Sequence, residues 1–196
     1  MKQEGSNRIS SGVIAAIAAA VVAVSGGVAW YAWNSPQNTP GTGIEQPNGT
    51  PSIEKSAEIY WLQATDKSFK LVPQAIKVKV AKDDGQQVLA AAFDTLLAGP
   101  TEGTNSSTIP QGTKLLGLKV KSDGVHVNLS TEYTSGGGSA SMIGRLGQVV
   151  YTATATNPTG KVFIEVNGKQ LDVLGGEGLE LEQPLTRASF DKNYQL

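Results

Sequence analysis

An uncharged stretch near the N-terminus places the strongest constraint on what this chain can form. Residues 12–33 read GVIAAIAAAVVAVSGGVAWYAW and contain no Asp, Glu, Lys or Arg. As a helix, at ~1.5 Å per residue, the stretch would be about 33 Å long, enough to cross a hydrocarbon layer of roughly 30 Å. We therefore expect residues 12–33 to form a transmembrane helix that serves as a signal anchor.

The charges on either side of this stretch predict its orientation. Lys2 and Arg8 precede it, and the next basic residue along the chain is Lys55. Because basic residues favour the cytoplasmic side, residues 1–11 are expected in the cytoplasm and the remainder outside it. The expected location is thus the inner (plasma) membrane, single pass, with a periplasmic or otherwise extracytoplasmic C-terminal domain.

A cleaved signal peptide is the alternative interpretation of the same stretch. Its apolar region would run over residues 13–24, with a cut after Ser25. The aromatic residues Trp30, Tyr31 and Trp33 favour the uncut anchor, because such rings prefer the membrane–water boundary. Both interpretations place the rest of the chain outside the cytoplasm.

The composition changes sharply after the apolar stretch. Residues 34–56 are rich in Pro, Gly, Asn, Thr and Ser, which bury too little apolar surface to fold, so they predict a disordered linker. Residues 57–196 remain, and their number fits one domain. The chain has no cysteine, which excludes disulfides and thiolate chemistry, and its 16 basic and 17 acidic residues leave no basic surface of the kind that binds nucleic acid.

Hydrophobic periodicity predicts the elements of this domain. Strands are expected at 58–63 and 70–80, with Pro73 marking an edge or a bulge. A helix is expected over 84–100, because Asp84 and Gln87 have capping-box spacing and Gly99-Pro100 ends the pattern. Two further strands are predicted within 113–133, around Asp123-Gly124.

The C-terminal half follows the same logic. Met142, Leu146, Val149 and Ala153 share one helical face, which favours a helix over the strand that the β-branched residues nearby would prefer. Residues 161–174 predict a hairpin with Asn167-Gly168 at its tip, and 179–190 a short strand and a loop. The order β-β-α-β-β-α-β-β indicates an α+β fold, with two helices on one face of a mostly antiparallel sheet.

Three consecutive glycines, Gly136–Gly138, precede the second predicted helix. A Walker phosphate loop requires a lysine after the glycines, and the dinucleotide motif belongs between a strand and a helix of a parallel unit. Neither condition is met by the predicted elements, so we expect a flexible loop capped by Ser139 or Ser141 and no bound cofactor.

Other residues with chemical potential also favour structural interpretations. His126 is the only histidine, and Asp123 is too near along the hairpin to orient it as in a catalytic triad. Glu177, Glu180 and Glu182 could pair for hydrolysis, but their alternation with leucines places them on the solvent side of a strand. A hydrolase using His126, Ser139 or these glutamates is the third hypothesis for function, and no catalytic or metal-binding residue is predicted.

Four lysines form the one candidate binding face. Lys77 and Lys79 alternate with apolar residues on one predicted strand, and Lys119 and Lys121 do so on another. Such a face could bind anionic wall polymers, although lysines on sheets also increase solubility and discourage edge pairing.

Five segments in order carry a resemblance to a known family. They are LLAGPTEG (96–103), TIPQGTKLLGLKV (108–120), DGVHVNLSTEY (123–133), LGQVVYTATATNP (146–158) and KVFIEVNGKQL (161–171). Across residues 57–175 the chain resembles the GerMN domain family of sporulation and germination proteins, and its C-terminal segment is similar to single-copy cyanobacterial members. The resemblance implies an extracytoplasmic α+β module, related in fold to ring-building modules, that associates through protein–protein contacts without catalysis.

The resemblance also assigns structural roles to the family's motif residues. Gly99 and Pro100 would end the first helix, Pro110 and Gly112 would turn the chain into the hairpin, and Asp123 and Gly124 would form its tip. Asn128 and Ser130 would lie on the outer face of the next strand. We therefore expect a membrane-anchored, non-catalytic envelope protein that binds other envelope proteins or itself, with binding of peptidoglycan or another wall polymer as the alternative.

Overall fold

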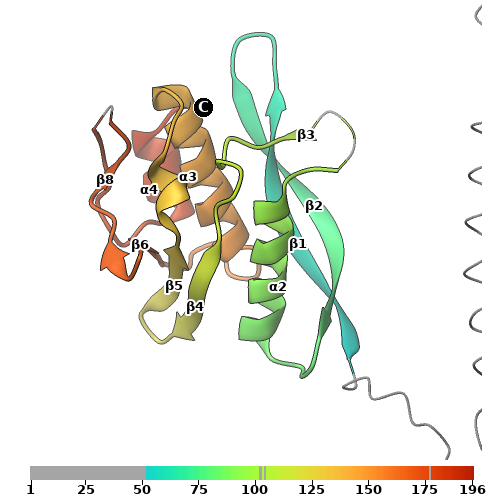
Figure 1. Ribbon diagram of the computed structural model, residues 1–196. Helices are drawn as coiled ribbons and strands as arrows, with labels where there is room; N and C mark the ends of the chain where they lie inside the picture. Colours follow the sequence, from blue (N-terminus) through green and yellow to red (C-terminus); the bar gives the residue numbers. More distant parts are fainter. Residues whose placement is uncertain (1–51, 102, 104, 177) are drawn as a thin grey trace, which may run out of the picture. The chain divides into compact units, whose positions relative to one another are not determined.

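The computed structural model describes residues 52–101, 103, 105–176 and 178–196 (Figure 1). The predicted cytoplasmic N-terminus, the predicted membrane helix at 12–33 and residues 34–51 of the predicted linker lie outside these residues. Within the described part of the chain, no helix has the length and apolar character needed to cross a membrane.

A long hairpin forms the first sheet. Strands β1 (Ile53–Ala64) and β2 (Phe69–Val80) pair antiparallel along their whole length, and β3 (Asn105–Ser106) pairs with the other side of β1. β1 begins at Ile53, so the predicted domain boundary at 57 lies four residues too late. Pro73 lies in β2, an edge strand of this sheet, where a proline removes no hydrogen bond from the ladder, as predicted.

The second sheet has the order β4-β5-β6-β7. Its strands are β4 (Leu115–Lys121), β5 (Gly124–Leu129), β6 (Val162–Val166) and β7 (Lys169–Gln170). Both predicted hairpins are confirmed, β4–β5 and β6–β7, but β5 and β6 run parallel. Strands β8 (Val173–Leu174) and β9 (Leu179–Glu180) form a separate small pair. The prediction of one sheet was therefore wrong, although most of the pairs are antiparallel.

Three α-helices lie in the described residues: α2 (Gly85–Ala98), α3 (Ser139–Ala153) and α4 (Arg187–Asn193), with a 3-10 turn η1 at Thr131–Thr134. α2 and α3 confirm the two predicted helices. α4 replaces the predicted loop at the end of 179–190. Its N-terminus is held by a reciprocal cap between Thr186 and Ser189, and its one buried side chain is Phe190. With one buried side chain in seven residues, α4 is too short to show a helical period in the sequence.

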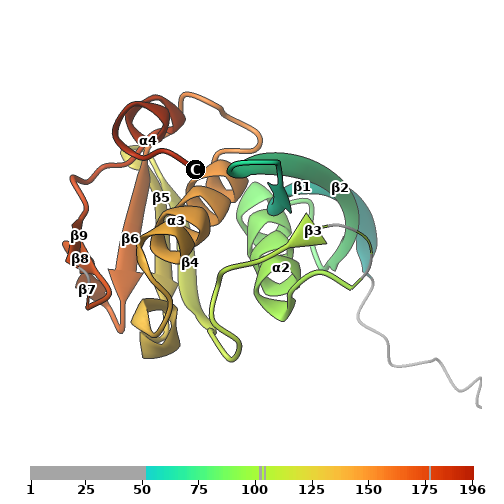
Figure 2. The ribbon, with the colours of Figure 1, turned by 90° about the horizontal axis from the view of Figure 1, so that it is seen from above.

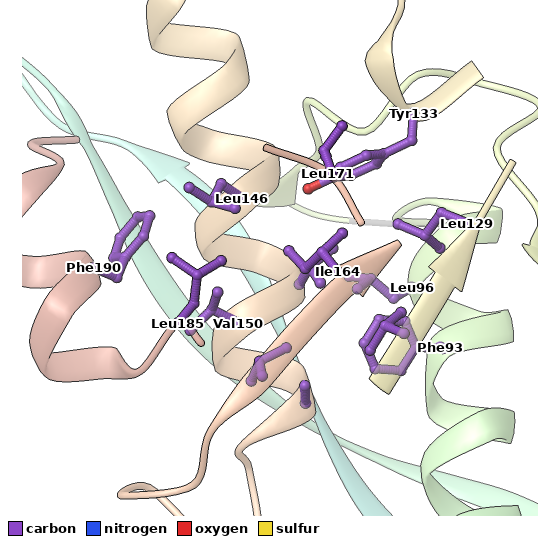
Figure 3. Close-up of a cluster of buried hydrophobic side chains, with 14 of the residues drawn as sticks. Phe93, Leu96, Leu129, Tyr133, Leu146, Val150, Ile164, Leu171, Leu185 and Phe190 are labelled. Atoms are coloured by element: carbon purple, nitrogen blue, oxygen red, sulfur yellow. The ribbon is translucent and has the colours of Figure 1, made fainter. Parts of the chain in front are cut away.

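Helices α2 and α3 lie on the inner side of the second sheet, and the β1–β2 hairpin covers them from the other side (Figure 2). α2 contacts β1, β2 and β4. Leu146 and Val150 of α3 belong to the same buried cluster as Leu129 of β5 and Ile164 of β6 (Figure 3). The helices thus form a middle layer between the β1–β2 hairpin and the second sheet. The sequence pattern had predicted only two layers, with both helices on one face of a single sheet.

Two glycines allow α3 to pack this closely against the β1–β2 hairpin. A methyl group on Gly144 would lie 2.7 Å from Leu62 Cδ1, and one on Gly147 would lie 2.9 Å from Leu71 Cδ1. Leu62 and Leu71 are cross-strand partners. These two glycines therefore permit a close helix–sheet contact. The predicted helical face Met142, Leu146, Val149 and Ala153 is fully buried as well.

A groove beside the β4–β5 turn

An open groove of about 900 Å³ is lined by residues of the β4–β5 turn and of the N-terminal part of α2. The β4–β5 turn and the N-terminus of α2 lie at the same end of the domain (Figure 1). Its walls come from four segments: the start of β1, the first turns of α2, the β4–β5 turn, and the loop at 154–161 that joins α3 to β6. These segments are distant in the sequence, so the groove is a product of the tertiary fold.

Aliphatic side chains form the floor of the groove, which we define as Val88, Leu89, Ala92 and Val120. Val120 lies on the same side of β4 as Leu118, because side chains alternate along a strand. Leu118 is 8% exposed and Val120 is 50% exposed, since the groove opens beside the end of the strand. An inward-facing aliphatic residue is thus accessible from solvent.

Hydrogen bonds fix the walls of the groove. On one side, Asp84 caps α2 by accepting a bond of 2.9 Å from the backbone N–H of Gln86. The Gln86 side chain in turn accepts a bond of 3.1 Å from the backbone N–H of Val120 and so ties α2 to β4. On the other side, the Val125 N–H donates to the carbonyl of Lys161 at 2.8 Å. The groove is therefore largely pre-formed.

Gly124 makes the hydrogen bond between Val125 and Lys161 possible. Its φ is +146°, and a methyl group at this position would lie 2.5 Å from the Lys161 carbonyl oxygen. Lys121 pairs with Gly124, so the central residues of the turn are Ser122 and Asp123. The predicted Asp123-Gly124 tip was therefore displaced by one residue, because Gly124 is needed for close approach to the neighbouring strand rather than for the turn itself.

The acidic side chains of the groove are engaged within the protein. Glu58 accepts a bond of 2.6 Å from the Tyr60 hydroxyl, and Asp83 pairs with Lys55 at 2.6 Å. Asp84 caps α2, and Asp123 lies 3.2 Å from His126. Lys121 and Lys161 also line the groove, and neither forms an ion pair with another residue of the described chain. The groove thus presents two cations that retain their capacity to pair.

His126 lies between two carboxylates, one of them that of Asp123 in the adjacent turn. Its Nε2 is 3.2 Å from both Asp123 carboxylate oxygens, and its Nδ1 is 3.6 Å from Glu165 Oε1. The turn carries the Asp123 side chain back over β5, and the hydrogen bond from His126 lowers the pKa of this carboxyl. The imidazole stacks on Phe163 with ring centres 4.5 Å apart. Because both ring nitrogens face carboxylates, the arrangement differs from a Ser-His-Asp triad.

The glycine-rich loop is closed around an internal cation. The Arg145 guanidinium donates to the carbonyls of Tyr133 at 2.7 Å, Ser135 at 3.0 Å and Gly136 at 2.7 Å. Arg145 is 2% exposed, and its burial lowers its pKa. The loop does lie between a strand and a helix of a parallel unit, β5-α3-β6, which corrects one reason for excluding a dinucleotide site. Its carbonyl oxygens, however, converge on Arg145 and leave a phosphate no cradle of N–H groups there.

The cap of α3 also differs from the prediction. Gly138 takes the N-cap position without a side-chain hydrogen bond, in place of Ser139 or Ser141. Glu180 lies in β9 and is exposed, Glu182 is exposed, and Glu177 is outside the described residues. No group of three His, Asp or Glu side chains suitable for a metal ion occurs in the described part of the chain.

The first four motif residues of the family lie at the end of α2 and in the turn before β4. Gly99 ends α2 with φ +88°, and its N–H donates to the Leu96 carbonyl at 3.2 Å, directly before Pro100. The Pro110 carbonyl accepts from the Thr113 N–H at 3.1 Å, closing a turn in which Gly112 has φ +87°. These turns position the start of β4.

Asn128 and Ser130 have different environments, which corrects the prediction that both face outward. The Asn128 side chain accepts a bond of 2.9 Å from the Gly168 N–H and so fixes the tip of the β6–β7 hairpin. Ser130 is buried, and its hydroxyl accepts a bond of 2.9 Å from the Lys114 N–H. It lies one residue beyond the end of β5, where the alternation of side chains along the strand no longer applies.

The four lysines of the predicted basic face belong to two sheets. Lys77 and Lys79 are in β2, whereas Lys119 and Lys121 are in β4, and α2 packs against both strands. Each pair alternates with residues that face α2, so the two pairs point away from each other. Lys77 is also paired with Glu54 at 2.8 Å. The four lysines therefore form two separate pairs, one on each sheet, and not one continuous face.

Comparisons with known proteins agree with this architecture. The sequence model of the Germane family, described as sporulation and spore germination, matches residues 58–172. The tandem GerMN domains of the sporulation protein GerM from Bacillus subtilis match with a TM-score of 0.53 and 20% identity, over 74% of this chain and 49% of that chain. The first GerMN domain of GerM matches with a TM-score of 0.53 and 20% identity, over 68% of this chain and 98% of that one.

The present chain therefore spans about half of the tandem structure and nearly all of a single GerMN domain. No match was found among curated proteins. At this identity the solved structures show the fold, and the family match confirms the GerMN prediction made from the five sequence segments.

Proposed function

Because the chain belongs to the Germane family of sporulation and spore germination (GerMN-type) domains, we propose that it is a non-catalytic interaction module of the cell envelope. The groove beside the β4–β5 turn is the observation that carries this proposal. It combines accessible aliphatic surface with two cations, Lys121 and Lys161, that have no ion-pair partner among the described residues, and hydrogen bonds hold its walls in place. Such a surface suits binding of another protein, with little rearrangement on binding.

The proposal includes the expected membrane anchor. Residues 12–33 are apolar and uncharged, and Lys2 and Arg8 precede them. In this account the segment holds the protein in the inner membrane, and the GerMN domain acts outside the cytoplasm at the end of a polar linker. A reporter fused behind Leu196 should be active on the outer side of the membrane, and activity in the cytoplasm would contradict this arrangement.

The interaction itself is tested with two equally exposed valines. Val120 in the groove is 50% exposed and Val173 in β8 is 49% exposed. The full chain is crosslinked in cells and purified, and the mass of the linked species is determined for wild type, Val120→Asp and Val173→Asp. Wild type and Val173→Asp should give the same heavier species, with another protein or with a second copy, and Val120→Asp should lose most of it. Recovery of monomer alone from wild type would contradict the proposed function.

Wall-polymer binding is the second candidate function, on the observation that Lys119 and Lys121 are exposed side by side on one face of β4. It requires co-sedimentation with purified peptidoglycan that weakens at high salt. Loss of co-sedimentation in Lys119→Ala/Lys121→Ala, but not in Lys77→Ala/Lys79→Ala, would favour it. Retention in both variants would exclude a lysine-mediated wall contact.

A further inference from the structure

We propose that the Asn167-Gly168 pair at the tip of the β6–β7 hairpin is a latent deamidation site, and that the side chains of Asn128 and Thr131 keep it from reacting in the folded domain. None of these four residues lines the groove, so the inference goes beyond the proposed function and does not depend on it. Asn128 fixes the hairpin tip, and the same hydrogen bond gives it a second, chemical role.

An asparagine followed by glycine can lose its side-chain amide without an enzyme. The Gly168 nitrogen loses its proton to base and attacks Cγ of Asn167. The N–Cγ bond forms, the Cγ–Nδ2 bond breaks, and ammonia leaves after taking up a proton from the solvent. Water then opens the resulting cyclic imide and leaves aspartate or isoaspartate at position 167. Glycine makes this attack easiest, because it has no Cβ to obstruct it.

The pair lies where solvent can reach it. Both residues are exposed, and they are the central residues of the turn, since Val166 pairs with Lys169. Their φ angles are +50° and +75°, the left-handed conformation of a type I′ hairpin turn. Burial therefore does not keep water or base from the reacting atoms, and protection has to come from the contacts that these atoms make.

Hydrogen bonds engage both groups that the reaction changes. The Gly168 N–H donates to Asn128 Oδ1 at 2.9 Å, which stabilises the protonated form of the attacking nitrogen. The Asn167 Nδ2 donates to Thr131 Oγ1 at 2.6 Å, which anchors the amide that would leave as ammonia. The reaction breaks both bonds, so each bond adds to its barrier. The Asn167 N–H also donates to the Leu129 carbonyl at 2.9 Å and fixes the start of the turn.

Protection depends on the tertiary fold, because the protecting side chains are distant in the sequence. Asn128 is 40 residues from Gly168, and Thr131 is 36 residues from Asn167. The parallel pairing of β5 with β6, in which Asn128 lies opposite Glu165, brings both to the hairpin. When the hairpin separates from β5, both bonds are lost and the pair becomes as reactive as in a free peptide. Deamidation at position 167 thus records the opening of this end of the sheet.

Peptide mapping of the full chain in detergent, kept at mildly alkaline pH, tests the proposal. Trypsin cleaves after Lys161 and Lys169, so the peptide 162–169 reports on this pair separately from the other Asn-Gly pair, Asn48-Gly49. Mass spectrometry measures the fraction of the peptide that has exchanged its amide for a carboxyl group. In wild type this fraction should grow on the order of tenfold more slowly in the folded protein than in urea, because two hydrogen bonds oppose the reaction.

Three variants assign the protection to its hydrogen bonds. Asn128→Ala removes the acceptor of the Gly168 N–H and should react on the order of fivefold faster than wild type. Asn128→Asp keeps an acceptor oxygen and should stay slow. Thr131→Val removes the acceptor of the side-chain amide and should also react faster. In urea all of these proteins should react at one rate, since the bonds are then absent.

Ser130→Ala is the matched control for a general loss of stability. The buried Ser130 hydroxyl accepts a bond from the Lys114 N–H at the same 2.9 Å, but this bond joins the start of β4 to the end of β5 rather than to the hairpin tip. This variant should deamidate at position 167 at the wild-type rate. Equal acceleration by Ser130→Ala and Asn128→Ala would overturn the inference, because the rate would then follow opening of the whole domain. Equal rates in folded wild type and in urea, or no acceleration by either Asn128→Ala or Thr131→Val, would overturn it as well.

Discussion

The Arg145 guanidinium donates a hydrogen bond of 2.7 Å to the backbone carbonyl of Tyr133, twelve residues earlier in the chain. With the bonds to Ser135 and Gly136, this contact fixes the segment that connects β5 to α3. The glycines of this segment therefore allow the chain to wrap around a buried cation. A site that resembles a phosphate loop in the sequence is, in the fold, filled by the protein's own arginine.

Replacement of Arg145 should destabilise the domain strongly. Arg145→Met would leave the buried Tyr133 carbonyl without its donor and would remove two partly buried bonds to Ser135 and Gly136, and we expect a loss of about 3 kcal/mol in the free energy of unfolding. Urea denaturation of the two proteins measures the difference. Arg145→Lys should recover part of it, because one ammonium can bond some of the carbonyls. Equal stability of Arg145→Met and wild type would show that these bonds contribute nothing.

Gly124 should tolerate no side chain. Gly124→Ala would place a methyl group 2.5 Å from the Lys161 carbonyl oxygen and separate β5 from the loop before β6. We expect a loss of about 2–3 kcal/mol in unfolding free energy, with part of the groove wall displaced. Gly136→Ala is the control: Gly136 also has positive φ, but a methyl group there meets no atom within 4 Å, so its cost should be about 1–2 kcal/mol. A cost for Gly124→Ala no larger than for Gly136→Ala would refute the close-contact explanation.

The cap of α2 should depend on Asp84 more than on Gln87. The sequence spacing predicts a capping box, but Asp84 accepts from Gln86 N–H, while the Gln87 side chain accepts a longer bond of 3.3 Å from Lys82 N–H. Asp84→Ala should reduce the free energy of unfolding by about 1 kcal/mol and Gln87→Ala by roughly half of that or less. Thermal or urea unfolding compares them. A larger effect of Gln87→Ala would favour the reciprocal box over the observed cap.

Tyr151 should titrate at unusually high pH. Burial, followed by the hydrogen bond from its hydroxyl to Asp191, raises its pKa from 10.0 to about 12. Because the folded protein disfavours the phenolate, the stability contributed by this group is complete below pH 10 and is lost as the pH rises toward about 12. Ultraviolet absorbance of the phenolate follows the titration, and Tyr151→Phe identifies the signal.

Asp191→Asn tests the assigned cause of this shift. The variant removes the carboxylate but leaves the tyrosine partly buried, so the pKa of Tyr151 should fall while staying above its ordinary 10.0. No change would mean that burial alone raises the pKa. A fall to 10.0 would mean that the carboxylate is the larger cause.

Local sequence patterns predicted those elements whose determinants lie within a few residues. The cap at Asp84, the stop at Gly99-Pro100 and the apolar face from Met142 to Ala153 located α2 and α3, and Asn167-Gly168 located the β6–β7 turn. Periodicity outweighed β-propensity in α3 because ten of its 15 residues, including the whole predicted apolar face, are buried in the domain. The five family segments also located the GerMN domain. Each contains a turn or a cap, and these are determined by residues close together in the sequence.

Features that depend on tertiary contacts could not be read from the sequence. The groove joins segments separated by up to about a hundred residues, and nothing near Val120 distinguishes its accessible position from that of buried Leu118. The contact between Asp123 and His126 depends on the geometry of a turn whose tip was assigned one residue too late. The parallel pairing of β5 and β6 likewise depends on the path of α3 across the sheet.

Photo-crosslinking in cells tests the central claim that the groove binds a protein partner. A photoreactive amino acid is introduced into the full chain at Val120, 50% exposed in the groove, or at Val173, 49% exposed in β8. The account predicts a discrete covalent complex with one protein after irradiation at position 120 and none at position 173. Monomer alone at position 120, or the same products from both positions, would contradict it.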